Sequence, residues 1–303
     1  MEIAPQFWRQ SVKLPILHFS DTTYIAGWIN ARETLTDEKL MPGTFMKVRG
    51  GLLKLLYTIA LYHLGIAVAI GQPDGREVVD QSVEWFSITS GIELSKKLSL
   101  MVEGQARYAR AFEPMQYQTR TALEVKLGER FALVPFGYVY TWNYLYGRQP
   151  TAFANHEHRL WQQLVYRHSF GKLRLDHRLR TEQRFIQRRT IDDNNVVYEG
   201  YSNRQFRARY RFQMRLPLNH PEIVPGTWFL GVYDEAFISW GKPVTFHEPD
   251  QNRIFTGVGY QFDTRFSALP GFYYQMLIKD NGLKQENNLG LQVMLTYNIK
   301  RND

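Results

Sequence analysis

The 303-residue chain contains no cysteine. Disulfide bonds and cysteine-ligated metal sites are therefore excluded. A chain without thiols is compatible with a bacterial protein exposed to the periplasm, although this absence alone does not assign a compartment. The chain also lacks low-complexity tracts and any linker-like segment, so the sequence offers no boundary between two folded domains.

Long apolar runs are scarce, and the only one lies near the start of the chain. A basic stretch at 46–49 leads into an apolar run that ends in small residues before Ala69. This order is typical of a secretory signal peptide, which we predict at 46–69 with cleavage after Ala69. The alternative is an uncleaved anchor helix over Leu52–Ile70, but Lys54 and His63 interrupt it. No other run approaches this length, so the mature chain is predicted to have no transmembrane helix.

Residues 1–45 show weak patterning and no motif that carries a mechanism. A signal peptide normally stands at the very N-terminus. We therefore expect translation to start at Met46 (or Met41), with residues 1–45 either misassigned or an unstructured extension. Residues 70–303 are then expected to form one domain.

The dominant pattern in that domain is strict alternation, most clearly over 172–218. From Leu173 to Phe185 and again from Phe206 to Leu218, apolar side chains alternate with charged or polar ones. A period of two predicts β-strands, because successive side chains leave opposite faces. These strands exceed the usual five or six residues. One face is apolar and the other is charged almost throughout.

The rest of the domain repeats this pattern, and eleven strands can be delimited. They are 85–94, 98–110, 116–127, 130–144, 155–170, 172–185, 205–218, 228–240, 253–263, 268–279 and 288–299. Single-chain bacterial barrels usually have an even number of strands. We expect ten to twelve, and favour twelve with one more strand in Arg76–Glu84. Pro135 cannot donate to a strand ladder, so its strand is predicted to be bent or bulged there.

These features together predict an all-β transmembrane barrel with antiparallel up-and-down topology. Lipid would contact the apolar face and water the charged face. The connections between strands alternate between short and long, and aromatic residues make up 15% of the chain, as expected for girdles at two membrane interfaces. The mean hydropathy of -0.38 does not oppose this, since only alternate residues would face lipid. The predicted location is the bacterial outer membrane, with membrane lipid and the barrel-assembly machinery as partners.

The net charge of +8 resides largely on the strand faces opposite the apolar rows. Much of this charge comes from arginines that alternate with apolar residues along the strands, so nucleic acid is not the expected partner. The candidate lumen residues are Arg174, Arg178, Arg180, Arg184, Arg207, Arg209, Arg211, Arg215, Glu235 and Arg253. Further inward acids are expected at Asp176, Glu182, Glu103, Glu124 and Glu157.

Three interpretations of the basic interior remain open. Arginine and carboxylate could form crosslinking ion pairs that stiffen the barrel. The excess of base could instead select anions in a narrow, porin-like channel. It could also form a specific ligand site. A small barrel can be filled by side chains, which would prevent conduction.

Asp250, Gln251, Asn252 and Arg253 form a polar stretch that enters the strand containing Gly257 and Gly259. Asp and Asn are expected to shape the turn while Arg253 points inward to pair with Glu235. A ligand site at the barrel mouth is the alternative. The two glycines are expected to relieve crowding inside the barrel or to mark a bend.

This Asp-Gln-Asn-Arg stretch, followed by Gly-x-Gly-Tyr, resembles the bacterial outer-membrane family of domain of unknown function 2490. The Asp234-Glu235 strand and the arginine-rich strand 207–218 match that family's pattern as well. The resemblance covers roughly residues 82–300. It implies an outer-membrane barrel and no assigned activity. The N-terminal extension departs from the family pattern.

Catalytic and metal motifs are weak. His156 and His158 share one strand face, but no third metal ligand can be identified. His168 and Ser169 are adjacent on a strand and so face opposite ways, and no Gly-x-Ser-x-Gly motif occurs. We therefore predict no catalytic residue, no metal and no cofactor. The alternative functions are an outer-membrane lipid-modifying hydrolase and a soluble periplasmic ligand-binding barrel.

Overall fold

A computed structural model describes residues 75–300, apart from 111, 152, 194, 202, 247 and 248. The described part is all-β, as predicted, and belongs to one compact unit within Gln72–Asp303. It contains no helix that is long and apolar enough to cross a membrane. The predicted extension at 1–45 and the predicted signal peptide at 46–69 lie outside the described residues.

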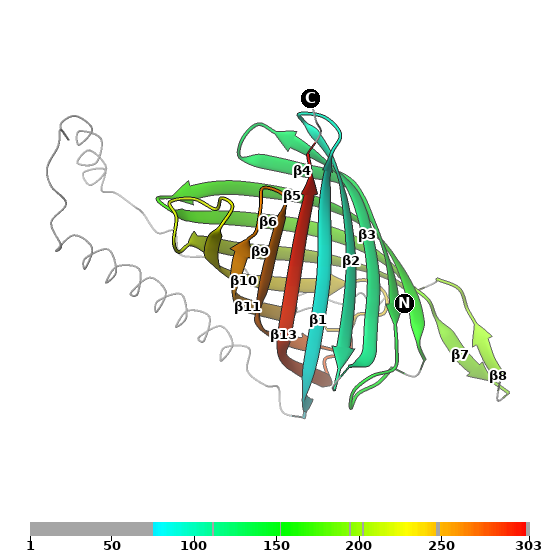
Figure 1. Ribbon diagram of the computed structural model, residues 1–303. Coiled ribbons are helices and arrows are strands. Elements are labelled where there is room, and N and C mark those ends of the chain that lie inside the picture. Colours follow the sequence, from blue (N-terminus) through cyan, green and yellow to red (C-terminus); the bar gives the residue numbers. More distant parts are fainter. Residues whose placement is uncertain are drawn as a thin grey trace, which may run out of the picture. The chain divides into compact units, whose positions relative to one another are not determined.

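The strands are longer than is usual in soluble proteins, and most of them form one barrel (Figure 1). Their bounds are β1 Glu77–Glu93, β2 Leu98–Ala109, β3 Glu113–Leu127, β4 Phe131–Asn143, β5 Asn155–Phe170, β6 Leu173–Ile186, β7 Arg189–Asp192, β8 Asn195–Tyr198, β9 Asn203–Pro217, β10 Thr227–Trp240, β11 Pro249–Gln261, β12 Phe266–Ile278 and β13 Lys284–Ile299. The barrel order is β1-β13-β12-β11-β10-β9-β6-β5-β4-β3-β2, and β7 pairs only with β8.

The barrel closes through a parallel pair, which the sequence did not predict. β1 and β13 run side by side in the same direction, with Glu77 opposite Lys284 and Ile92 opposite Ile299 (Figure 1). All other neighbours in the barrel are antiparallel. The favoured count of twelve strands and the purely antiparallel topology were therefore wrong. Arg76–Glu84 forms no strand of its own, because β1 continues through it as one strand of 17 residues. Eleven up-and-down strands necessarily bring the first and last strands together in parallel.

The two ends of the barrel differ in the length of most of their connections; the longer link 218–226 and the shorter link 110–112 are exceptions. One end, called the short-turn end, carries the links 94–97, 128–130, 171–172, 218–226 and 262–265. The other end, called the long-loop end, carries 110–112, 144–154, 187–202, 241–248 and 279–283. The link expected as a loop at Arg188–Tyr201 contains the β7–β8 hairpin, which projects away from the barrel wall in Figure 1.

The outer face of the barrel is apolar and exposed. Every barrel strand contributes at least one large apolar side chain that is exposed: Ile88, Val102, Leu123, Phe136, Leu164, Leu179, Phe206, Trp228, Val258, Phe272 and Leu291. On β13, Leu289 and Leu291 are 61% and 51% exposed, whereas their neighbours Asn288 and Gln292 are buried. The period-two pattern thus separates an exposed apolar face from an enclosed polar face.

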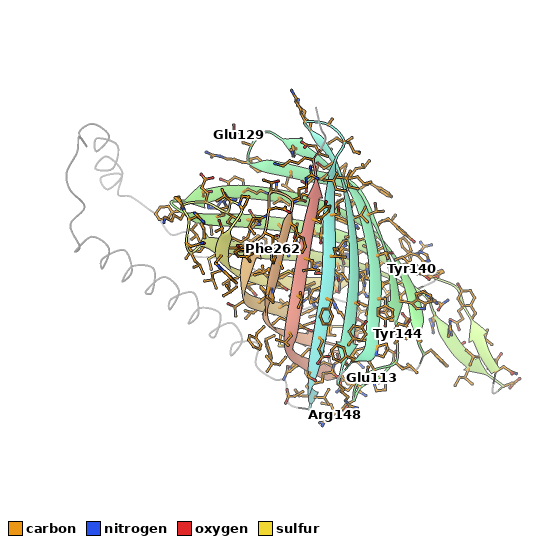
Figure 2. All side chains as sticks on the ribbon, viewed as in Figure 1. Glu113, Glu129, Tyr140, Tyr144, Arg148 and Phe262 are labelled. Atoms are coloured by element: carbon orange, nitrogen blue, oxygen red, sulfur yellow. The ribbon has the colours of Figure 1, made fainter. Side chains whose placement is uncertain are left out.

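Aromatic rings gather on the outer face near both ends of the barrel. At the short-turn end, Trp228 and Phe262 both contact Tyr260, with ring centroids 4.7 and 4.9 Å apart. At the long-loop end, Tyr117 contacts Tyr144 at 5.3 Å. Figure 2 shows Tyr140 and Tyr144 on the outside, toward the end that carries Glu113 and Arg148, with Glu129 at the opposite end. Two aromatic bands therefore flank the apolar middle.

The predicted irregularity at Pro135 is confirmed. The register between β4 and β5 shifts between Val134 and Gly137. Trp161, fully buried, packs where a side chain on Gly137 would stand, since an added Cβ would lie 2.2 Å from the indole ring. The absence of a side chain at Gly137, beside the register shift, thus leaves room for this tryptophan inside the barrel.

Candidate functional site: the arginine-lined interior

The barrel encloses a cavity of about 820 Å³. Residues from both ends line it, among them Thr89 and Thr296 near the short-turn end and Asn281 and Lys284 at the long-loop end. One cavity therefore reaches residues near both ends of the barrel.

The cavity lining carries a large excess of positive charge. Twelve arginines, two lysines and five acidic residues are among the described residues that line it: Arg107, Arg120, Arg159, Arg167, Arg178, Arg180, Arg184, Arg207, Arg209, Arg211, Arg215, Arg253, Lys279, Lys284, Glu103, Asp176, Glu235, Asp250 and Asp280. A concentration of one charge in an enclosed space of low dielectric attracts ions of the opposite sign. The interior is therefore suited to anions.

Part of this charge is neutralised by buried carboxylates on β5 and β6. Glu157 accepts hydrogen bonds from Arg159 Nε and Arg184 Nε, both at 2.5 Å. Glu182 accepts from Arg207 Nη2 at 2.5 Å and from Arg209 Nη1 at 2.6 Å. Each glutamate therefore joins two arginines, and these contacts link the neighbouring strands β5, β6 and β9 on the inner side of the wall.

Glu235 on β10 is shared by still more arginines. It accepts hydrogen bonds from Arg209 Nη2 at 2.7 Å, from Arg253 Nη1 at 3.4 Å and from Arg178 Nη2. Its side chain is 2% exposed. In the strand register, Glu235 stands directly opposite Arg211 on β9 and Arg253 on β11. One carboxylate cannot neutralise this many guanidinium groups.

Several interior arginines consequently have unused hydrogen-bond donors. A buried Nε–H without a hydrogen-bond partner occurs in Arg107, Arg120, Arg178, Arg211, Arg215 and Arg253. Within the described part of the chain, Arg107 and Arg211 have no carboxylate at ion-pair distance. Arg180 donates to the neutral Gln163 at 2.7 Å, and its carboxylate partner Glu182 lies 3.9 Å away.

Aromatic rings hold these guanidinium groups in place. Arg107 and Arg253 both lie over the ring of Trp85, at 3.9 and 4.6 Å from its centroid. Arg180 lies 4.1 Å from the centroid of the Trp161 ring. Such cation–π contacts stabilise a cation without neutralising its charge. The arginines are thereby fixed while their charge stays available.

The wall formed by β1 and β10–β13 also carries interior aromatic side chains. Trp85, Tyr233, Phe255 and Tyr273 pack together there in one buried cluster. An added Cβ on Gly257 would lie 2.7 Å from the ring of Phe255, and one on Gly259 would lie 2.5 Å from the ring of Phe229. The two glycines therefore give room to interior aromatic rings, as expected. This cluster narrows the cavity from one side.

A loop also reaches into the interior at the long-loop end. Tyr146, from the link between β4 and β5, lines the cavity and donates a hydrogen bond to Glu286 at 3.0 Å. Glu286 also pairs with Lys279 at 2.5 Å. Burial and the adjacent Glu286 raise the pKa of the Tyr146 phenol well above its usual range, so this hydroxyl stays protonated as a donor.

The candidate residues named from the sequence do not all lie in the cavity. Arg178, Arg180, Arg184, Arg207, Arg209, Arg211, Arg215, Glu235, Asp250, Gln251 and Arg253 line it. Arg174 does not; it lies at the short-turn end, 3.7 Å from the exposed Glu222. Asn252 lies on the outer face, where its amide donates to Asp234 at 2.8 Å. The four-residue motif is thus divided between the two faces of β11.

Some important interior residues were absent from the candidate set. Arg107 and Arg120 stand on the polar face of their strands, so the alternation alone could have identified them. Arg159 likewise lies two residues from Glu157 on β5, so it shares the face on which Glu157 was predicted to point inward. The two tryptophans, Trp85 and Trp161, gave no comparable signal. Their roles depend on which side chains meet across the barrel.

His156 and His158 lie on the outer face in an aromatic band. Tyr140 is hydrogen-bonded to His156 Nδ1 at 2.7 Å, and Tyr138 to His158 Nδ1 at 2.6 Å. In the described residues, no group of three or more histidine, aspartate or glutamate side chains is placed to hold a metal ion. His168 stacks on His177, with ring centroids 5.3 Å apart.

Comparison with known proteins identifies a family without an assigned activity. Neither the curated proteins nor the solved structures contain a match to this chain. A family model described as a protein of unknown function, DUF2490, matches residues 84–287, from β1 into β13. Because this match covers more than half of the sequence, the chain belongs to the DUF2490 family.

Proposed function

We propose that this protein is a bacterial outer-membrane β-barrel whose arginine-lined interior forms a narrow, anion-preferring channel. The proposal rests mainly on the contrast between the outer and inner faces of the barrel wall. Exposed apolar residues cover the outside, and a cavity with a large excess of arginine runs inside. This is the arrangement that a barrel in lipid requires.

The strand lengths support a membrane location. β12 has 13 residues, which corresponds to about 43 Å along the strand and about 30 Å along an axis tilted by about 45°. The hydrocarbon core of a bilayer is about 30 Å thick. The aromatic bands near both ends of the barrel would then lie at the two interfaces.

The alternative of a soluble periplasmic barrel is less well supported. Such a barrel would place its apolar face inside and its charged face in water. Here apolar side chains such as Phe272 and Leu291 are 65% and 51% exposed, while Arg180 is 2% exposed. A contiguous apolar surface around all eleven barrel strands would promote aggregation in water.

The alternative of a lipid-modifying hydrolase would need a nucleophile beside a general base. Ser169 and His168 are adjacent residues of β5 and leave opposite faces. The His168 ring is instead engaged in stacking on the outer face. We therefore favour transport over catalysis.

The proposal is tested by electrical recording from purified protein in a planar bilayer with a KCl gradient. We expect small conductance steps and a reversal potential displaced toward the equilibrium potential of chloride. Arg180→Glu, which reverses one buried charge in the lining, should shift the reversal potential toward that of potassium. A folded, inserted barrel that does not conduct would contradict the proposal, and so would a reversal potential that does not respond to Arg180→Glu.

A further inference from the structure

The interior arginines that lack sufficient carboxylate partners gather around one face of β10. Four of them, Arg107, Arg178, Arg211 and Arg253, are called here the open arginine cluster. They come from β2, β6, β9 and β11, so they reach the centre from several sides of the barrel. Arg211 lies 5.3 Å from the centroid of the Tyr233 ring.

The charge of this cluster is not balanced within the protein. Arg178 and Arg211 stand directly opposite each other on β6 and β9. Like charges at directly opposed positions destabilise a sheet. Glu235, the carboxylate that serves Arg178 and Arg253, is also bound by Arg209. Burying a charge without a partner is unfavourable, so a bound anion would stabilise the cluster.

The guanidinium groups of the cluster are also incompletely hydrogen-bonded. All four members line the cavity, and the buried Nε–H of each has no partner within the protein. Arg253 is 4% exposed. Two members, Arg107 and Arg253, are held on the Trp85 ring. The donors are therefore preorganised, which lowers the entropy lost when a ligand binds.

We propose that the open arginine cluster is a binding site for a phosphate group, either free phosphate or the phosphate of a small metabolite. The planar guanidinium fork matches the oxygens of phosphate better than a spherical halide. A dianion also balances two of the surplus charges at once. The inference deepens the proposed function, and it rests on that function for the route by which the anion reaches the site.

The test is isothermal titration of inorganic phosphate into refolded barrel in detergent, at pH 7.5 and constant ionic strength set by chloride. We expect saturable binding to the unmodified protein. The double variant Arg107→Gln/Arg211→Gln should bind at least about tenfold more weakly, because two charge-assisted donors are lost. The control Arg188→Gln, on the exposed link before β7, should bind like the unmodified protein.

One further variant, a folding control and a second ligand complete the test. Arg211→Lys retains the charge but loses the fork, and it should bind with intermediate affinity. Heat-dependent mobility in gel electrophoresis identifies variants that fail to fold, and binding is compared only among folded ones. A hexose phosphate in place of inorganic phosphate distinguishes the two sources, since tighter binding of the ester indicates a metabolite and equal or weaker binding indicates free phosphate.

Binding in detergent requires no conduction, so the two proposals fail separately. A barrel that binds phosphate but does not conduct would overturn the channel and retain the site. A barrel that conducts chloride but shows no saturable phosphate binding would overturn the site and retain the channel. Equal phosphate affinity in the unmodified protein and in the folded double variant would also overturn the site.

Discussion

At the scale of single residues, the interior depends on a few glutamates that serve several arginines each. Glu235 is the most heavily shared, since three arginines donate to it. Arginine alone could not be enclosed at this density, because each guanidinium loses water on burial. The carboxylates therefore make a basic interior compatible with folding.

Replacing Glu235 with glutamine should strongly destabilise the barrel. The change keeps the size of the side chain but removes the negative charge that Arg178, Arg209 and Arg253 share. Breaking a buried ion pair typically costs about 3–5 kcal/mol. The expected result is unfolding at lower denaturant concentration, measured by tryptophan fluorescence in detergent.

Glu199→Gln provides the matched control, because Glu199 pairs with Arg188 outside the barrel. Its effect should be small, since exposed ion pairs contribute little. If both variants unfolded at the same denaturant concentration as the unmodified protein, the interior network would not be stabilising.

The sequence predicts which face an arginine occupies but not what it contacts. Alternation placed Arg207 and Arg209 on the polar face, and both line the cavity. Arg207 pairs with Glu182, which stands opposite it in the register of β6 and β9. Arg211 stands opposite Glu235 on β10, but that carboxylate is bound by three other arginines. Register depends on contacts between strands distant in sequence, and a single chain does not reveal it.

At the scale of elements, most strands are where the alternation predicts them. Exceptions arise where two segments pair as strands although their sequences were expected to form a loop. Residues 189–198, expected as part of a loop, form β7 and β8, which pair only with each other. Exposed apolar residues such as Ile191 and Val197 lie on this hairpin. A two-stranded element of this kind contributes little to a barrel that is closed without it.

Replacing Arg189–Tyr198 with a short glycine-rich linker should therefore leave the barrel intact. The hairpin shares no strand pairing with the barrel. We expect the shortened protein to fold and to show the same heat-dependent mobility on a gel as the full chain. A shortened protein that cannot be refolded would show that the hairpin is part of the folding unit.

At the scale of the whole molecule, the closure through β1 and β13 could not be predicted. These strands lie about 200 residues apart in sequence, and their pairing satisfies two edges that would otherwise be open. The alternation within β1 and within β13 is the same for a parallel and an antiparallel partner. The alternation delimits eleven strands, but the usual even number of strands favoured a twelfth, so the parallel closure required the structure.

The apolar outer surface leads to a prediction about insertion of the barrel into a lipid bilayer. Leu291→Arg places a charge on the exposed apolar face of β13 and should cost about 2–4 kcal/mol near the bilayer midplane. We expect slower or incomplete folding into liposomes, measured by the heat-dependent shift on a gel. Leu283→Arg, at the exposed turn before β13, should fold normally. A soluble barrel would tolerate both changes alike, since both leucines are exposed.

The central claim is that the apolar face contacts lipid while the arginine-lined face encloses the cavity. The absence of cysteine allows single cysteines to be introduced at 288, 289, 291 and 292 of β13 and labelled with an environment-sensitive fluorophore. In liposomes, brominated lipids should quench the fluorescence of the label at positions 289 and 291 but not at positions 288 and 292. Quenching at 288 and 292 instead, or at none of the four, would contradict the account.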